Sequence, residues 1–181
     1  MREVTFLGLY NKDVKNLSGE IWTLNDWFRV FPKLNPARVY QIHFEFSGMH
    51  PADPGRFKDW RKHYEDSGAE IVVTSDLGFS RQRFFDTDRA LKEWPAAVFQ
   101  STMSCMLLDA IWEGVDVVNF EGIALLGDEY TYQVPALLRN IDATRAAGVR
   151  VNAPREQIWR DSISTVDWSN IHEIAKPYWM Q

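Results

Sequence analysis

Short apolar segments alternate with helical segments along the chain, and this alternation limits the possible folds more than any other feature. Six segments are rich in the β-branched and aromatic residues that favour strands: residues 4–9, 20–24, 39–46, 70–74, 116–120 and 149–152. Residues 56–67, 102–113 and 133–147 are typical of helices, and a glycine follows each of them. We therefore predict an α/β fold, a Rossmann-like three-layer domain with a mainly parallel sheet of five to six strands.

The length of 181 residues favours one domain, covering residues 1–181. Two stretches have no regular pattern. Residues 75–100 carry several arginines among phenylalanines, and residues 154–181 form an irregular C-terminal tail with three tryptophans. No linker, repeat or low-complexity segment divides the chain.

Charge and composition exclude several classes of protein. The net charge of −5 and the pI near 5.4 argue against general nucleic-acid binding or binding to anionic membranes, which need a basic face. No apolar run approaches 18 residues, so we expect no membrane partner. The single cysteine, Cys105, lies in an apolar helical run and is expected to be a core residue. These features favour a cytoplasmic protein.

Ligands of parallel α/β sheets sit beyond the carboxyl ends of the strands, and this rule selects the candidate site. Gly8 and Asn11 follow the first strand, but G-x-G-x-x-G and the P-loop motif are both absent. We therefore expect no NAD or FAD and assign no cofactor. Asn25, after the second strand, is either a base or ribose contact or a helix N-cap.

Two further strand-end or helix-start segments carry candidate ligand contacts. Ser101 and Thr102 open a helix, where they act as caps or bind an anion through the free N–H groups. Gly122 would let a ligand approach the backbone, and Tyr130 and Tyr132 could donate to phosphate. The alternative for this loop is solvated chain with its tyrosines packed on the core.

Acidic and basic side chains near the strand ends are candidates for chemistry. His43, Glu45 or Asp128 could be a general base, while Arg81 and Arg83 could stabilise a phosphate leaving group. His43 and Glu45 share a strand face, but no histidine pair or cysteine cluster has ligand spacing. We therefore predict no metal.

Three short motifs resemble bacterial sialyltransferase-like proteins and Rossmann-like proteins of phages and prophages. They are "EIWTLND", "FQSTMSCMLLDAIWEGVDVVNFEGI" and "AAGVRVNAP", and the resemblance covers residues 4–154. It implies that Asn25 contacts base or ribose, that Ser101 and Thr102 lie at the nucleotide, and that Gly122 allows the ligand to approach. Two features depart from the family: the first loop lacks its Gly-Asn-Gly-Pro-Ser-like sequence, and no histidine lies between Tyr132 and Pro154.

Three functions follow as hypotheses. The first is an enzyme of glycosyltransferase type that uses a nucleotide or nucleotide sugar. The second is a protein that sequesters or senses a nucleotide without chemistry, which the missing histidine and the short chain favour. The third is an interaction protein on a Rossmann-like core, with the tryptophan-bearing tail as its contact surface. The sequence leaves open whether the chain forms a homo-oligomer.

Overall fold

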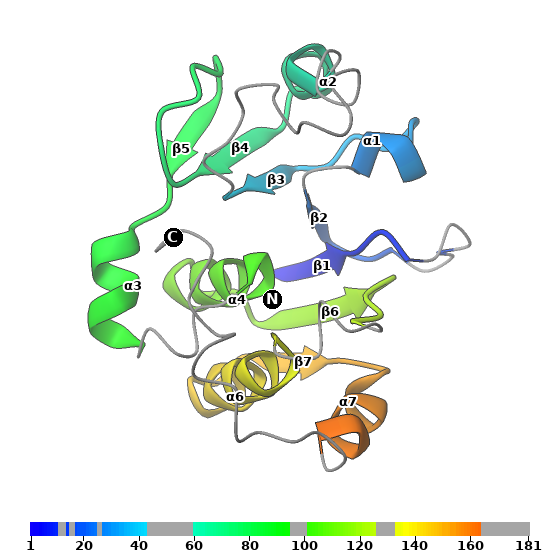
Figure 1. Ribbon diagram of the computed structural model, residues 1–181, viewed down its shortest axis with the longest axis vertical. Coiled ribbons are helices and arrows are strands. Elements are labelled where there is room, and N and C mark those ends of the chain that lie inside the picture. Colours follow the sequence, from blue (N-terminus) through cyan, green and yellow to red (C-terminus); the bar gives the residue numbers. More distant parts are fainter. Residues whose placement is uncertain are drawn as a thin grey trace.

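A computed structural model describes residues 1–10, 14, 17–24, 27–42, 60–94, 101–125 and 133–163, with Trp60 placed by its backbone alone. Within them, a single seven-stranded sheet runs through the molecule with helices packed against it (Figure 1). The strands are β1 (Glu3–Leu7), β2 (Glu20–Leu24), β3 (Arg38–Gln41), β4 (Glu70–Val73), β5 (Gln82–Phe84), β6 (Val117–Glu121) and β7 (Arg150–Asn152). The helices are α1 (Trp27–Val30), α2 (Trp60–Ser67), α3 (Thr87–Glu93), α4 (Thr102–Trp112), α6 (Gln133–Ala146) and α7 (Glu156–Ile163).

The strand order is β5-β4-β3-β2-β1-β6-β7, and every pair is parallel. The chain first builds outward from β1 to β5, then returns through α4 to the other side of β1. The strand order therefore reverses between β1 and β6. In open parallel sheets this topological switch point is where ligands bind.

Each face of the sheet has its own apolar core. Side chains alternate between the faces along a strand, so Tyr40 and Val39 separate onto opposite sides. Tyr40, Phe6 and Trp22 pack with α4, α6 and α7 in the larger core. Val39 packs with Trp27 of α1 and with Tyr64 of α2 in the smaller one. Helices on both faces agree with the predicted α/β fold with a parallel sheet.

Two predictions about the strands need correction. The sheet has seven strands rather than five to six, because β5 forms within the stretch that was expected to be irregular. β5 has only three residues, Gln82 to Phe84, and Phe84 is exposed, so it lacks the buried apolar run that marks a strand. The first strand ends at Leu7 and not at residue 9.

The C-terminal tail also differs from its prediction. Glu156–Ile163 forms α7, and Trp159 on this helix is 1% exposed in the larger core. An exposed Ile158 beside the buried Trp159 hides the helical pattern in so short a segment. Cys105 is buried, as predicted for a core residue. None of the described helices is long and apolar enough to cross a membrane.

Candidate functional site

The carboxyl ends of β1 and β6 meet at the switch point, and two predicted glycines hold them together. Gly8 N–H donates to Glu121 O at 2.8 Å, and Tyr10 N–H donates to Gly122 O at 2.9 Å. A Cβ atom on Gly8 would lie 2.4 Å from Gly122 O, closer than any side chain allows. Gly122 adopts a left-handed backbone with φ of +62°. The two glycines are thus required by the approach of one backbone to the other.

A small crevice lies beside these strand ends. Its volume is about 110 Å³, and its lining residues are Tyr10, Phe120, Glu121, Gly122, Ile123, Pro154, Arg155 and Trp159. We call it the switch-point crevice. Drug-sized ligands occupy pockets of about 300–1,000 Å³, so the crevice has room for one moiety of such a ligand.

Three polar or aromatic side chains give the crevice its chemistry. Tyr10 is 60% exposed, and the guanidinium carbon of Arg155 lies 5.0 Å from the centroid of its ring. This places a cation over one ring face at the rim. Glu121 is half-buried at the end of β6 and supplies a carboxylate. The rim therefore offers a stacking surface, a positive charge and a hydrogen-bond acceptor.

A hydrogen bond from α7 holds the base of the crevice. Trp159 donates from Nε1 to Ala124 O at 2.9 Å, which fixes the loop after β6 against α7. The next residue, Leu125, has a φ of +48°, a left-handed conformation that a bulky side chain rarely adopts. Such strain persists only where the surrounding structure enforces it, and it gathers at functional sites.

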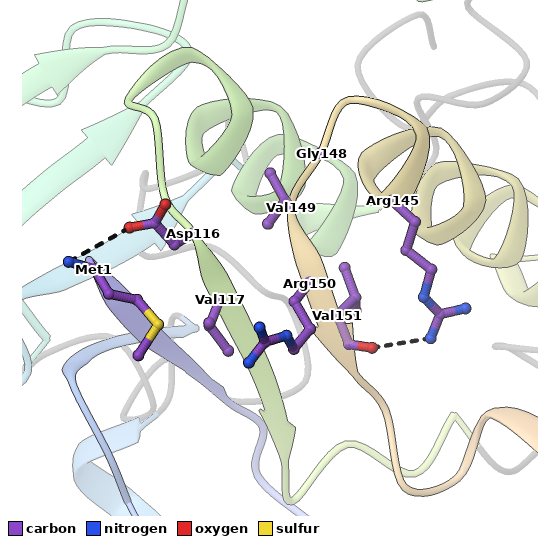
Figure 2. Close-up of a pocket in the computed structure, with 8 residues that line it drawn as sticks. All are labelled: Met1, Asp116, Val117, Arg145, Gly148, Val149, Arg150 and Val151. Atoms are coloured by element: carbon purple, nitrogen blue, oxygen red, sulfur yellow. Dashed lines mark hydrogen bonds and ion pairs between the residues drawn. The ribbon is translucent and has the colours of Figure 1, made fainter.

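A larger groove occupies the opposite end of the sheet (Figure 2). It has a volume of about 700 Å³ and is lined by Met1, Asp116, Val117, Arg145, Gly148, Val149, Arg150 and Val151. Two of its charged groups and Asp116 have partners within the protein: the N-terminal amine lies 3.8 Å from Asp116, and Arg145 binds Val151 O and Glu156. It lies at the amino ends of β6 and β7, away from the ends that bind ligands in this fold.

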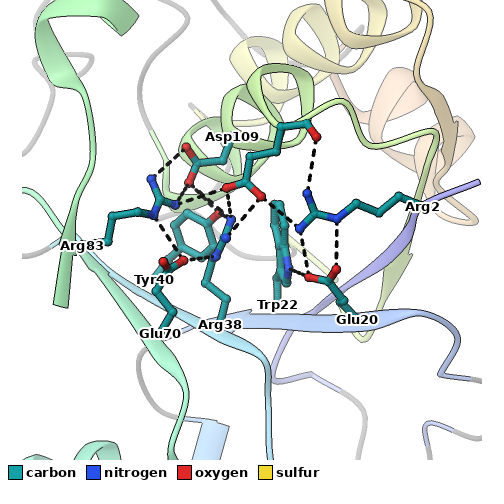
Figure 3. A network of polar contacts seen from close by, with 9 residues as sticks. Arg2, Glu20, Trp22, Arg38, Tyr40, Glu70, Arg83 and Asp109 are labelled. Carbon is teal, nitrogen blue, oxygen red and sulfur yellow. Dashed lines mark hydrogen bonds and ion pairs between the residues drawn. The ribbon is translucent and has the colours of Figure 1, made fainter. Parts of the chain in front are cut away.

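The amino ends of the strands carry a dense network of charges (Figure 3). It joins Arg2, Glu20, Trp22, Arg38, Tyr40, Glu70, Arg83, Asp109 and Glu113, and we call it the amino-end network. Arg38 makes a paired contact with Glu113 at 2.7 and 3.2 Å and lies 2.6 Å from Glu70. Paired guanidinium–carboxylate contacts of this kind are among the strongest polar contacts in proteins.

Asp109 is the buried centre of the amino-end network. Its side chain is 2% exposed, accepts the Tyr40 hydroxyl at 2.7 Å and pairs with Arg83 at 2.5 Å. Burial, and then the charge of Asp109, raises the pKa of Tyr40 well above its ordinary value. The hydroxyl therefore stays protonated and can donate to the carboxylate.

The predicted arginines both have partners inside the protein. Arg83 belongs to the amino-end network, and Arg81 donates to Gly68 O. The carboxylates of Asp109 and Glu70 offset the charge of Arg83, whereas the partner of Arg81 is a neutral carbonyl. Sequence patterns could not show this, because Arg83 and Asp109 are 26 residues apart in the chain.

Ser101 and Thr102 lie at the start of α4. Ser101 occupies the N-cap position, but its side chain makes no capping hydrogen bond. The end of α4 lies at the amino ends of the strands, because Asp109 and Glu113 belong to the amino-end network there. The 11-residue helix is about 16 Å long. Its start therefore lies toward the carboxyl ends, although neither residue lines the switch-point crevice.

Of the predicted site residues, the structure thus brings Gly8 and Gly122 together. Arg81, Arg83, Ser101 and Thr102 lie elsewhere on the described chain. The others fall outside the described residues: Asn11, Asn25, His43, Glu45, Asp128, Tyr130 and Tyr132. The part of the chain that the structure describes contains no group of three His, Cys, Asp or Glu side chains that could hold a metal ion.

Sequence reasoning missed Tyr10, Arg155 and Trp159. Tyr10 follows Gly8 closely, so the strand-end rule could have found it. Arg155 and Trp159 required recognition of α7. No protein-family model, curated protein or solved structure matches the chain. Its function therefore has to be argued from the site itself.

Proposed function

We propose that the chain binds a nucleotide or nucleotide sugar at the carboxyl ends of β1 and β6. The observation that carries this proposal is the switch-point crevice, with the exposed Tyr10 ring beside Arg155 at its rim. Ligands of parallel α/β proteins bind at such a position. An aromatic ring can stack on a base, and a guanidinium can pair with phosphate.

The small volume of the crevice fits one part of a nucleotide. The base or sugar would enter beside Tyr10, and the remainder would extend over the neighbouring strand ends. The predicted phosphate contacts remain Ser101 and Thr102 at the start of α4 and the two tyrosines, Tyr130 and Tyr132. Arg155 is a further candidate for that role, because it is half-buried at the rim.

Glycosyl transfer would require a general base beside the acceptor hydroxyl. Among the described residues that line the crevice, Glu121 is the one carboxylate and none is a histidine. His43, Glu45 and Asp128 stay the predicted bases. The single described carboxylate favours the second candidate, a protein that binds or sequesters a nucleotide without catalysis.

Calorimetry with nucleoside monophosphates, nucleoside diphosphates and UDP-glucose tests the proposal. We expect at least one of them to bind, and Tyr10→Ala to weaken that binding about fivefold to a hundredfold, the usual contribution of one stacked base. The free energy of unfolding should change by less than about 0.5 kcal/mol, since the ring is largely exposed.

Phe84→Ala is the matched control, because Phe84 is 54% exposed on β5, at the far edge of the sheet. Its affinity should equal that of the wild type. If no nucleotide binds the wild type, the proposal is wrong and the interaction-protein hypothesis leads. Product analysis with a nucleotide sugar that binds then separates the enzyme from the binding protein.

A further inference from the structure

The guanidinium of Arg155, at the rim of the switch-point crevice, has no hydrogen-bond acceptor within the described chain. Its carbon atom lies 5.0 Å from the centroid of the Tyr10 ring, and no hydrogen bond or ion pair joins it to another described residue. Arg155 is half-buried and lines the crevice together with Tyr10. A positive charge without a carboxylate partner among the described residues therefore lies at the proposed binding site.

Four other arginines that lie over aromatic rings differ from Arg155 in this respect. Each of them also binds a carboxylate or a carbonyl: Arg2 pairs with Glu20, Arg38 with Glu113 and Arg89 with Glu93, and Arg61 donates to Gly78 O. In those four arginines the ring contact accompanies a stronger polar contact. For Arg155 it is the only polar or ring contact that the guanidinium makes within the described residues.

Contact with a ring leaves the hydrogen-bond donors of a guanidinium unused. The group is planar, so its face can lie on an aromatic ring while its N–H groups point outward in its own plane. Tyr10 can therefore hold Arg155 in position while the donors stay open to an oxyanion. Phosphate suits these donors, because a guanidinium can bind it through two parallel hydrogen bonds.

We propose that Arg155 makes the switch-point crevice selective for phosphorylated nucleosides. This inference rests on the proposed function and narrows the ligand class to nucleoside 5′-phosphates and their esters, excluding free nucleosides. The base stacks on the face of the Tyr10 ring that Arg155 leaves open, since Tyr10 is 60% exposed. The phosphate, one ribose away from the base, reaches past the ring edge to Arg155. One tyrosine thus positions both contacts.

The test compares the four ribonucleosides with their 5′-monophosphates. Calorimetry measures the monophosphates, and NMR titration measures the nucleosides, because it detects binding in the millimolar range. In the wild type we expect at least one monophosphate to bind about tenfold to a hundredfold more tightly than its nucleoside, the usual contribution of a hydrogen bond to a charged group. Arg155→Met should remove this preference and leave nucleoside affinity unchanged, because methionine still packs on the ring but carries no charge or donor.

Arg139→Met is the matched control. Arg139 is exposed on α6 and does not line the crevice, so this change removes the same charge from another surface of the protein. The preference for the monophosphate should persist in this variant. Its loss would show that the preference comes from overall charge and would overturn the role of Arg155.

Three other results would also contradict this role. They are equal affinity of the wild type for nucleoside and monophosphate, a preference that persists in Arg155→Met, and loss of nucleoside binding in Arg155→Met. The last would show that Arg155 positions Tyr10 and does not contact phosphate. All three leave the nucleotide site itself standing. If no nucleoside, monophosphate or nucleotide sugar binds the wild type, the proposed function fails as well.

Discussion

The two ends of the sheet are built on opposite principles. At the amino ends, arginines and carboxylates from four strands and α4 satisfy one another in the amino-end network. At the carboxyl ends, the described chain has an open crevice, a strained Leu125, an exposed Tyr10 and an unpaired Gln41. Polar groups satisfied internally support the fold, whereas an exposed ring such as that of Tyr10 leaves a surface that a ligand can contact.

The largest effect is expected from Asp109→Ala at the amino ends. This change leaves the Arg83 guanidinium and the Tyr40 hydroxyl without their buried carboxylate, which should lower the free energy of unfolding by about 3–5 kcal/mol. Urea denaturation measures the change. Asp142→Ala is the control, because this carboxylate is 55% exposed and its ion pairs should contribute about 0–1 kcal/mol. Equal losses in the two variants would show that the buried network has no special role.

An intermediate effect is expected from Gly8→Ala at the switch point. The added methyl group would overlap Gly122 O, so overpacking should cost about 1–3 kcal/mol and shift the strand ends that line the crevice. Gly114→Ala is the control, since nothing lies within 4 Å of its added methyl group and only its left-handed backbone is strained. Both variants should lose stability, but only Gly8→Ala should change the amide chemical shifts of Tyr10 and Ile123. Unchanged shifts in Gly8→Ala would refute the close packing of the strand ends.

The smallest effect is expected from Glu156, which opens α7 near the crevice. The hydrogen bonds from Arg145 lower the pKa of Glu156, against the opposing effect of burial. Because the pKa is lower in the folded state than in the unfolded state, the ionised carboxylate stabilises the fold at pH values above the unfolded-state pKa. This stabilisation disappears as the pH falls through the folded-state pKa. Glu156→Gln should therefore lose about 1 kcal/mol or less at pH 7, and variant and wild type should converge as the pH falls below the folded-state pKa. A gap that stays constant as the pH falls below that pKa would contradict this assignment.

Much of the fold could be predicted because its signals are local. Residues 70–74 and 116–120 form buried apolar runs, and the strands β4 and β6 occupy most of these ranges. Gly114 and Gly148 follow the helices that they were expected to end, and both have positive φ angles. β5 and α7 escaped prediction because one has three residues and the other presents a single buried side chain.

The candidate site was less predictable, because its contacts join distant parts of the chain. The strand-end rule placed Gly8 and Gly122 at the sheet edge. It did not predict that the two backbones approach each other so closely that both positions require glycine. The crevice also needs Arg155, which is far from Tyr10 in the sequence but lies over its ring in the fold. The sequence around an arginine such as Arg83 does not show whether a carboxylate of the protein or a phosphate of a ligand neutralises its charge.

The contact between Arg145 and β7 lies at an edge of the described sheet. β7 is an outer strand: Arg150 N–H donates inward to Asp116 O, so the carbonyl of the next residue, Val151, points away from the sheet. Arg145 donates to that carbonyl at 2.9 Å. An incoming strand from another molecule would have to displace a guanidinium that also binds Glu156. A charged side chain on an edge strand is one of the features that hinder edge-to-edge pairing of open β-sheets, and Arg145 places one at Val151.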